Sequence, residues 1–172
     1  MPDGPGLELL RGEIEVDLDG AVLATSYAKD RAVLIVDPSR IRDVLTWLRD
    51  TPGQGYRFLS SLHVADYLPA EPRFGVHYEL LNRERCERLR IKAMLPAESP
   101  AIDSCVGLFP TANFQEREAF DFFGVVFNGH PELTRILLPE DYVGWPQRRD
   151  FPIGGEPVVF THNDTPSLGV PR

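Results

Sequence analysis

The sequence predicts an α+β protein with two layers. The predicted element order is β-β-α-β-β-β, followed by short helices and an extended irregular C-terminal tail. Three observations support this class: apolar stretches recur between residues 21 and 95, one helical period interrupts them, and prolines gather after residue 139. A chain of 172 residues is long enough for one domain with its own core.

The first two strands are predicted at residues 21–27 and 32–36. Both stretches are rich in apolar and β-branched side chains, and the polar turn Lys29-Asp30-Arg31 separates them. We therefore expect a β-hairpin.

A helix is predicted after the hairpin. Asp37 occupies the N-cap position and Pro38 the first helical position, which is a common way to begin a helix. Apolar residues then follow at the spacing of one helix face: Ile41, Val44, Leu45 and Leu48. The helix should end before Pro52.

Three further strands are predicted at residues 57–68, 73–81 and 87–95. In the last of them apolar and polar residues alternate, which indicates a sheet with one covered face. The linkers at 68–72 and 81–87 are short, so we expect consecutive antiparallel neighbours.

The pattern changes after residue 95. Ser99-Pro100 should open a short helical stretch that Pro110 ends. Thr111 should cap a second helix that runs to Gly124, a residue suited to a left-handed C-cap.

The C-terminal part from Pro139 to Arg172 contains six prolines and four glycines, which argues against a continuous helix or strand. We expect an α+β domain over residues 1–124. Residues 125–172 should form a segment and extended tail that bind a partner.

Composition excludes several function classes. The net charge of −8 and pI near 5 argue against nucleic acid and anionic lipid as direct partners. No apolar run is long enough to span a bilayer and no leader peptide is predicted, so we expect a cytosolic chain with no direct membrane insertion. Cys86 and Cys105 lack metal-ligand spacing and are interpreted as reduced structural thiols.

The stretch EREAFDFFG at residues 116–124 combines charges with aromatics. On a helix turning about 100° per residue, Glu116 falls within the apolar arc, while Arg117 and Asp121 form an i, i+4 pair on the polar side. A carboxylate among phenylalanines needs a partner. We expect a row of backbone N–H groups or one of three arginines: Arg135, Arg148 or Arg149.

Phe114 lies on the polar side of this helix, which is unusual for a helix that faces water. We therefore expect the tail or another chain to cover it.

An enzymatic interpretation finds little support. Glu116 and Glu118 could pair as carboxylates with His130 as ligand or base, but their helix positions point about 160° apart. His130, between a glycine and a proline, fits a turn better. Gly53-Gln54-Gly55 lacks the rest of a dinucleotide motif. The arginines named above could bind an anion, yet interleaved acids favour ion pairs: Glu132, Glu140, Asp141 and Asp150.

Residues 116–152 closely resemble the signature of the 30 kDa-type subunit of respiratory complex I, the proton-pumping NADH:quinone oxidoreductase. The chain departs from that signature at Thr134, Trp145 and Gln147. The resemblance marks the following as signature and interface residues: Glu116, Arg117, Glu118, Asp121, Gly124, Gly129, His130, Pro131, Arg135, Asp141, Arg148, Arg149 and Asp150.

The resemblance implies a non-catalytic structural subunit of the hydrophilic arm, in an enzyme that couples electron transfer from NADH to quinone with proton translocation. It implies no catalytic residue, cofactor or metal in this chain, and FMN and iron–sulfur clusters in partner subunits. The chief partner would be the quinone-site subunit of complex I, designated D, which lines the quinone cavity. The chain would be part of a hetero-oligomer, held peripherally at the cytoplasmic face of the cell membrane.

Two alternatives stay open. The chain could serve a related complex with another electron donor, of ferredoxin, F420H2 or hydrogenase type, or it could be a free-standing binding module. A tail that binds a partner should expose its apolar residues in the isolated chain, whereas a free-standing protein should fold them back: Phe151, Ile153, Val158, Val159 and Phe160.

Overall fold

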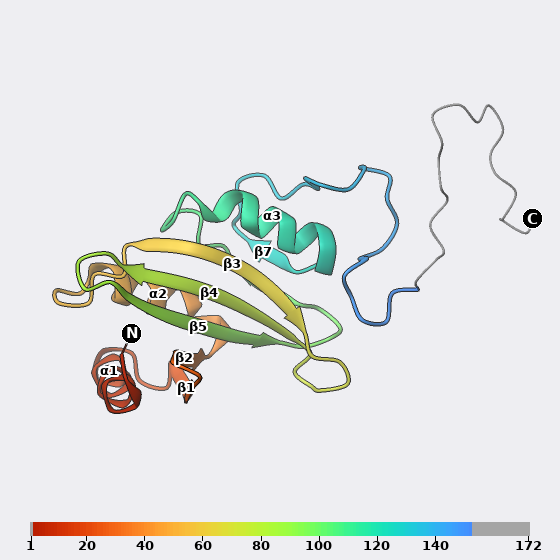
Figure 1. Ribbon diagram of the computed structural model, residues 1–172. Helices are drawn as coiled ribbons and strands as arrows, with labels where there is room; N and C mark the ends of the chain where they lie inside the picture. Colours follow the sequence, from red (N-terminus) through yellow and green to blue (C-terminus); the bar gives the residue numbers. More distant parts are fainter. Residues whose placement is uncertain (1, 153–172) are drawn as a thin grey trace, which may run out of the picture.

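The computed structural model describes residues 2–152 and has the predicted α+β class (Figure 1). Its elements are α1 (Gly4–Asp17), β1 (Val22–Ala28), β2 (Arg31–Val36), a 3-10 turn (Pro38–Arg40), α2 (Ile41–Asp50), β3 (Phe58–Asp66), β4 (Phe74–Asn82), β5 (Glu87–Leu95), β6 (Ala101–Asp103), α3 (Ala112–Phe123) and β7 (Val126–Asn128).

Five strands form one sheet in the order β1-β2-β5-β4-β3. The expected hairpin joins β1 to β2, and β3, β4 and β5 are consecutive antiparallel neighbours, as predicted. β2 and β5 run parallel, with Val33 opposite Arg90. The sheet is therefore mixed, and the helix between β2 and β3 carries the chain across it.

One face of the sheet holds the core. The four apolar residues predicted for α2 are all fully buried, and so are the alternate side chains of β5 that face them. α1 lies against β1 and β2, while α3 runs along β3 at the far edge of the sheet (Figure 1). The elements thus form the two expected layers.

The N-terminal helix α1 was not predicted. Its signals are present in the sequence, because Asp3 caps the Gly6 N–H at 2.7 Å and Pro5 lies in the first turn. Leu7, Leu10 and Ile14 face the sheet. Six acids among the first twenty residues conceal this weak apolar stripe.

The short helical stretch expected after Ser99-Pro100 is wrong. Residues Ala101–Asp103 form β6, which pairs in parallel with β7. The partner strand lies about one helix further along the chain, so no local periodicity indicates this pairing.

Thr111 precedes α3, but its side chain does not cap the helix. Its hydroxyl instead donates to the Leu59 carbonyl at 3.5 Å. The C-terminal prediction is confirmed, since Gly124 adopts a left-handed conformation with φ 71° and its N–H bonds the Phe120 carbonyl.

Candidate protein-binding surface

Asp121 is the buried polar centre of the surface around α3. Its Oδ2 accepts hydrogen bonds from three successive backbone N–H groups, those of Ile136, Leu137 and Leu138, at 3.0, 2.8 and 2.9 Å. Burial alone would raise the pKa of Asp121, but these bonds and the Arg135 guanidinium together lower it. The ionised Asp121 therefore anchors the segment that follows β7.

Arg135 completes this anchor. Its Nη1 donates to Asp121 Oδ1 at 2.8 Å, and its Nη2 donates to the carbonyls of Tyr142 and Gly144 at 3.0 and 3.1 Å. The guanidinium also lies 4.8 Å from the centroid of the Trp145 ring. One arginine thus joins α3 to two parts of the irregular segment.

The predicted pair of Arg117 with Asp121 is wrong. Arg117 donates instead to the Thr134 carbonyl and hydroxyl, both at 3.1 Å, and to the Arg135 carbonyl at 3.0 Å. The face of α3 that looked polar is covered by residues 134–138, which helical periodicity does not reveal. Thr134 supplies an acceptor here that a basic side chain would lack.

Glu116 is buried as predicted, but no arginine pairs with it. Its Oε2 accepts from the Ser104 hydroxyl at 2.6 Å and its Oε1 from the Cys105 N–H at 2.8 Å. Burial raises the pKa of Glu116, and the bonds from Ser104 and Cys105 offset only part of this effect. The expected row of backbone N–H groups serves Asp121 instead.

His130 lies in a turn, as the sequence suggested. Its Nε2 donates to the Asn113 carbonyl at 3.2 Å, and its Nδ1 accepts from the Glu132 N–H at 3.0 Å. With both ring nitrogens bonded to backbone, His130 fastens the turn after β7 to α3. Within residues 2–152 no group of His, Cys, Asp and Glu side chains is placed to hold a metal ion.

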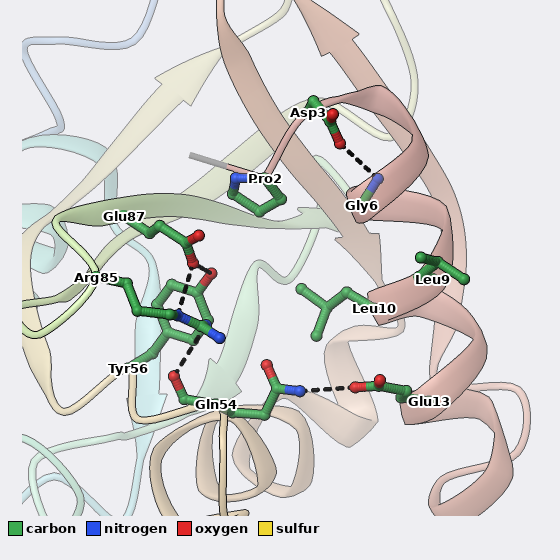
Figure 2. Close-up of a pocket in the computed structure, with 10 residues that line it drawn as sticks. All are labelled: Pro2, Asp3, Gly6, Leu9, Leu10, Glu13, Gln54, Tyr56, Arg85 and Glu87. Atoms are coloured by element: carbon green, nitrogen blue, oxygen red, sulfur yellow. Dashed lines mark hydrogen bonds and ion pairs between the residues drawn. The ribbon is translucent and has the colours of Figure 1, made fainter.

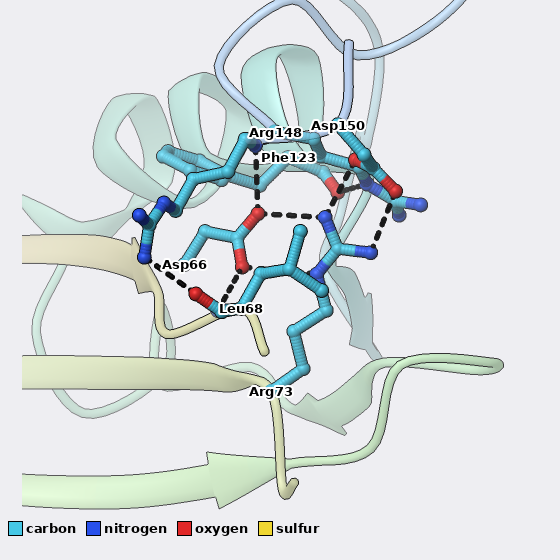
Figure 3. A network of polar contacts seen from close by, with 7 residues as sticks. Asp66, Leu68, Arg73, Phe123, Arg148 and Asp150 are labelled. Carbon is cyan, nitrogen blue, oxygen red and sulfur yellow. Dashed lines mark hydrogen bonds and ion pairs between the residues drawn. The ribbon is translucent and has the colours of Figure 1, made fainter. Parts of the chain in front are cut away.

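The end of the described segment is fixed by Arg73, which binds two carboxylates at once (Figure 3). It donates to Asp66 at 2.9 and 2.7 Å and to Asp150 at 2.9 and 2.6 Å. The hydrogen bonds from Arg73 lower the pKa values of both aspartates. Residue 150 is thereby held against the β3–β4 connection.

Arg148 and Arg149 reinforce the same junction. Arg148 Nε donates to the Phe123 carbonyl at 2.7 Å, and its guanidinium lies 5.0 Å from the centroid of Phe74. The Arg149 N–H donates to Asp66 Oδ2 at 2.8 Å. The ion pairs found among the described residues differ from those expected with the interleaved acids: Arg135 pairs with Asp121 on α3, and Asp150 pairs with Arg73.

Trp145 occupies the position where the resemblance expects histidine. Its ring lies edge-on to Phe120, with centroids 5.4 Å apart. It also lies directly over Gly124, where a Cβ atom would come within 2.6 Å of the indole. The segment up to Phe151, which stacks on Tyr142, therefore folds back onto α3. The other tail residues named above lie outside the described part.

Large apolar side chains remain exposed beside this anchored segment. Phe114 is 64% exposed, Leu137 61% and Val143 88%. Residues 139–152, the described part of the expected tail, therefore do not cover Phe114. Its cover by another chain stays a prediction. Three of the signature residues are also exposed in α3 and the anchored segment: Glu118, Pro131 and Asp141.

A separate cleft of about 430 Å³ opens between α1 and the β4–β5 turn (Figure 2). Its polar groups already bind one another: Gln54 donates to Glu13 at 2.7 Å, and the Tyr56 hydroxyl donates to Glu87 at 3.3 Å. Burial raises the pKa of Tyr56 to about 12. None of the signature residues lines this cleft, which shows no nucleophile activated by a base.

Comparisons with known proteins agree with the sequence signature. The profile of the family described as respiratory-chain NADH dehydrogenase, 30 kDa subunit, matches residues 34–157. The NADH-quinone oxidoreductase subunit designated C of Roseiflexus sp. (strain RS-1) is 44% identical over 146 residues, which cover 85% of this chain and 84% of that protein. Its counterpart in Roseiflexus castenholzii is 45% identical over 150 residues, covering 87% and 86%.

Solved structures share the fold. A trypsin-resistant fragment of Nqo5 is 27% identical, with a TM-score of 0.63, covering 74% of this chain and 98% of the fragment. A chain of the archaeal membrane-bound sulfane sulfur reductase has a TM-score of 0.67 at 23% identity and covers 85% of each chain, which shows the fold alone. Among the described residues, no helix is long and apolar enough to cross a membrane.

Proposed function

The chain belongs to the family of the 30 kDa subunit of respiratory-chain NADH dehydrogenase, and from this premise we propose that it is a non-catalytic structural subunit of the hydrophilic arm of NADH:quinone oxidoreductase. In this proposal α3 and residues 130–150 bind the quinone-site subunit. The chain would carry no cofactor, and it would be held at the cytoplasmic face of the membrane by its partners.

One observation carries the proposal: three large apolar side chains stand exposed on a surface that is otherwise rigidly anchored. Phe114, Leu137 and Val143 lie on or beside elements fixed by Asp121 and Arg135. Exposed apolar side chains on a preorganised backbone are typical of protein interfaces, because little conformational entropy is lost when they are covered.

The electron donor proposed is NADH, since the relatives at 44% and 45% identity are named NADH-quinone oxidoreductase subunits. The alternative of a related complex with another donor rests on the fold shared with the sulfane sulfur reductase chain alone. The role proposed for this chain is the same in either complex: it positions neighbouring subunits without exchanging electrons.

The test replaces an exposed apolar residue on this surface and one elsewhere. Phe114→Glu places a charge on α3, and Val16→Glu is the matched control because Val16 is 84% exposed on α1. Each tagged full chain is expressed in the source cells and recovered from detergent-solubilised membranes. We expect the Phe114→Glu chain to recover at least about tenfold less of the quinone-site subunit, and the Val16→Glu chain to recover it as the unmodified chain does. The reason is that a charge buried at the interface costs more than about 1.4 kcal/mol of binding free energy.

Equal recovery of the quinone-site subunit by both variants would place its binding site elsewhere on the chain. Recovery of no respiratory subunits by the unmodified tagged chain would refute the structural role itself.

A further inference from the structure

The face of the sheet opposite the core has no helix layer among the described residues. Strand register puts Arg90 beside Glu79 and Val33, and Lys92 beside His77 and Ile35, all on this outer face. One end is covered by Tyr67: a Cβ atom at Gly75 would lie 2.7 Å from its ring, and Lys92 Nζ lies 4.1 Å from the ring centroid. The other end is open.

The open end contains a hollow of about 290 Å³ that crosses four strands. Its polar side chains include three arginines, two serines and one carboxylate: Arg31, Ser60, Ser61, Glu79, Arg88 and Arg90. Glu79 is already bound to Arg90, whose side chain is 21% exposed. Arg31 and Arg88 are exposed, and within residues 2–152 neither guanidinium forms a hydrogen bond or an ion pair.

This concentration of positive charge is unusual for the chain. Among residues 2–152, the strands place four cations on this outer face, Arg31, Arg88, Arg90 and Lys92, and one carboxylate, Glu79, whereas the whole chain has a net charge of −8. The exposed guanidiniums of Arg31 and Arg88 offer bidentate donors for carboxylates. Half-buried apolar residues, among them Val33 and Ile35, lie on the same face.

We propose that this outer sheet face is a second docking surface and that its occupant is an acidic segment of a neighbouring protein subunit, whose carboxylates bind Arg31 and Arg88. The charge of the face selects an acidic partner. The apolar residues beside the cations suit a protein chain, and the negative charge of the rest of the molecule repels anionic membranes and nucleic acid. The inference goes beyond the proposed contact with the quinone-site subunit, because no signature residue lines the hollow.

The direct test places a photo-cross-linking amino acid, p-benzoyl-phenylalanine, at Ser61 in the tagged full chain, within the intact complex. After irradiation, the cross-linked peptide is identified by mass spectrometry. We expect an acidic peptide of another subunit. A cross-link to lipid, to this chain's own residues 153–172, or to no protein at all would overturn the proposal.

Charge reversal tests the role of the guanidiniums. Arg88→Glu in the Ser61 probe background should lower the yield of this cross-link about tenfold or more, because the variant removes a charge-assisted donor and repels the acidic segment. Arg42→Glu is the matched control: Arg42 is exposed on α2, the helix that covers the opposite face. An unchanged yield in Arg88→Glu would contradict electrostatic docking.

The failure of this inference is distinguishable from that of the proposed function. If the complex is recovered but the Ser61 probe finds no acidic peptide, only the outer sheet face is excluded. If no respiratory subunit is recovered with the chain, the proposed function fails first.

Discussion

Two buried carboxylates on α3 have pKa values shifted in opposite directions. Asp121 accepts three backbone N–H groups and a guanidinium, whereas Glu116 accepts one hydroxyl and one N–H. Desolvation acts on both, but the donors outweigh it only at Asp121, so the pKa of Asp121 is lowered and that of Glu116 is raised.

Asp121→Asn should destabilise the fold by about 3–5 kcal/mol, because it leaves Arg135 without its counter-charge and turns the amide NH2 either toward the Arg135 guanidinium or toward the three backbone N–H groups of residues 136–138. Urea unfolding of the isolated chain at neutral pH measures this change. Glu118→Gln, one turn away and exposed, is the control and should change stability little. Equal small effects of both variants would contradict the anchoring role of Asp121.

The shifted pKa values of Asp121 and Glu116 predict how each residue makes the stability of the fold depend on pH. Since the folded pKa of Asp121 lies below its unfolded value of about 3.9, its contribution is complete above that value and is lost as pH falls through the folded pKa. Glu116 acts oppositely: its folded pKa lies above about 4.3, so its ionisation costs stability as pH rises from that value through the folded pKa.

Glu116→Gln should therefore remove the loss of folding free energy that the ionisation of Glu116 causes in the wild-type protein. The amide keeps one acceptor for the Cys105 N–H and offers a donor to the Ser104 hydroxyl, which can rotate. Unfolding free energies of both proteins, measured from pH 4 to 8, should show the variant gaining on wild type as pH rises. A variant that loses stability relative to wild type over this range would contradict the raised pKa.

At the scale of elements, the C-terminal end of α3 is where residues 145–148 pack back onto the helix. Gly124 has φ 71° and lies beneath Trp145, with Arg148 Nη2 2.9 Å from where a Cβ atom would stand. Glycine is needed here both for backbone conformation and for the close approach of the indole.

Gly124→Ala should destabilise the protein by about 1–2 kcal/mol from the left-handed backbone and by about 1–3 kcal/mol more from overlap with Trp145. A double-mutant cycle with Trp145→Ala separates the two effects, because the overlap disappears in that background while the backbone cost stays. Strict additivity of the two substitutions would mean that the indole does not press on Gly124.

Periodic elements could be predicted from the sequence, and contacts between distant segments could not. The strands at 73–81 and 87–95 match β4 and β5 within a residue, and the helix predicted from Pro38 is a 3-10 turn over Pro38–Arg40 that continues into α2. β6 pairs with a strand that follows α3, and Asp121 is covered by a loop with no period of its own. A helical projection assigns a polar face, but it does not show which part of the chain returns to cover it.

At the scale of the molecule, the described surface has several faces of different chemistry. Cations gather on the outer sheet face, and exposed apolar side chains lie both by α3 with the anchored segment and on α1 with β1, where Leu9 and Val16 stand among the acids of α1. Subunits of hetero-oligomers need several distinct faces because each neighbour must recognise its own.

The structural role is tested most directly by purifying the tagged full chain from detergent-solubilised membranes, identifying its partners by mass spectrometry and assaying NADH:quinone reductase activity in the eluate. The account predicts that the quinone-site subunit, the iron–sulfur subunits and the membrane subunits are recovered in equal proportions with NADH-dependent activity. Recovery of the chain alone, as a soluble protein without respiratory partners, would contradict it.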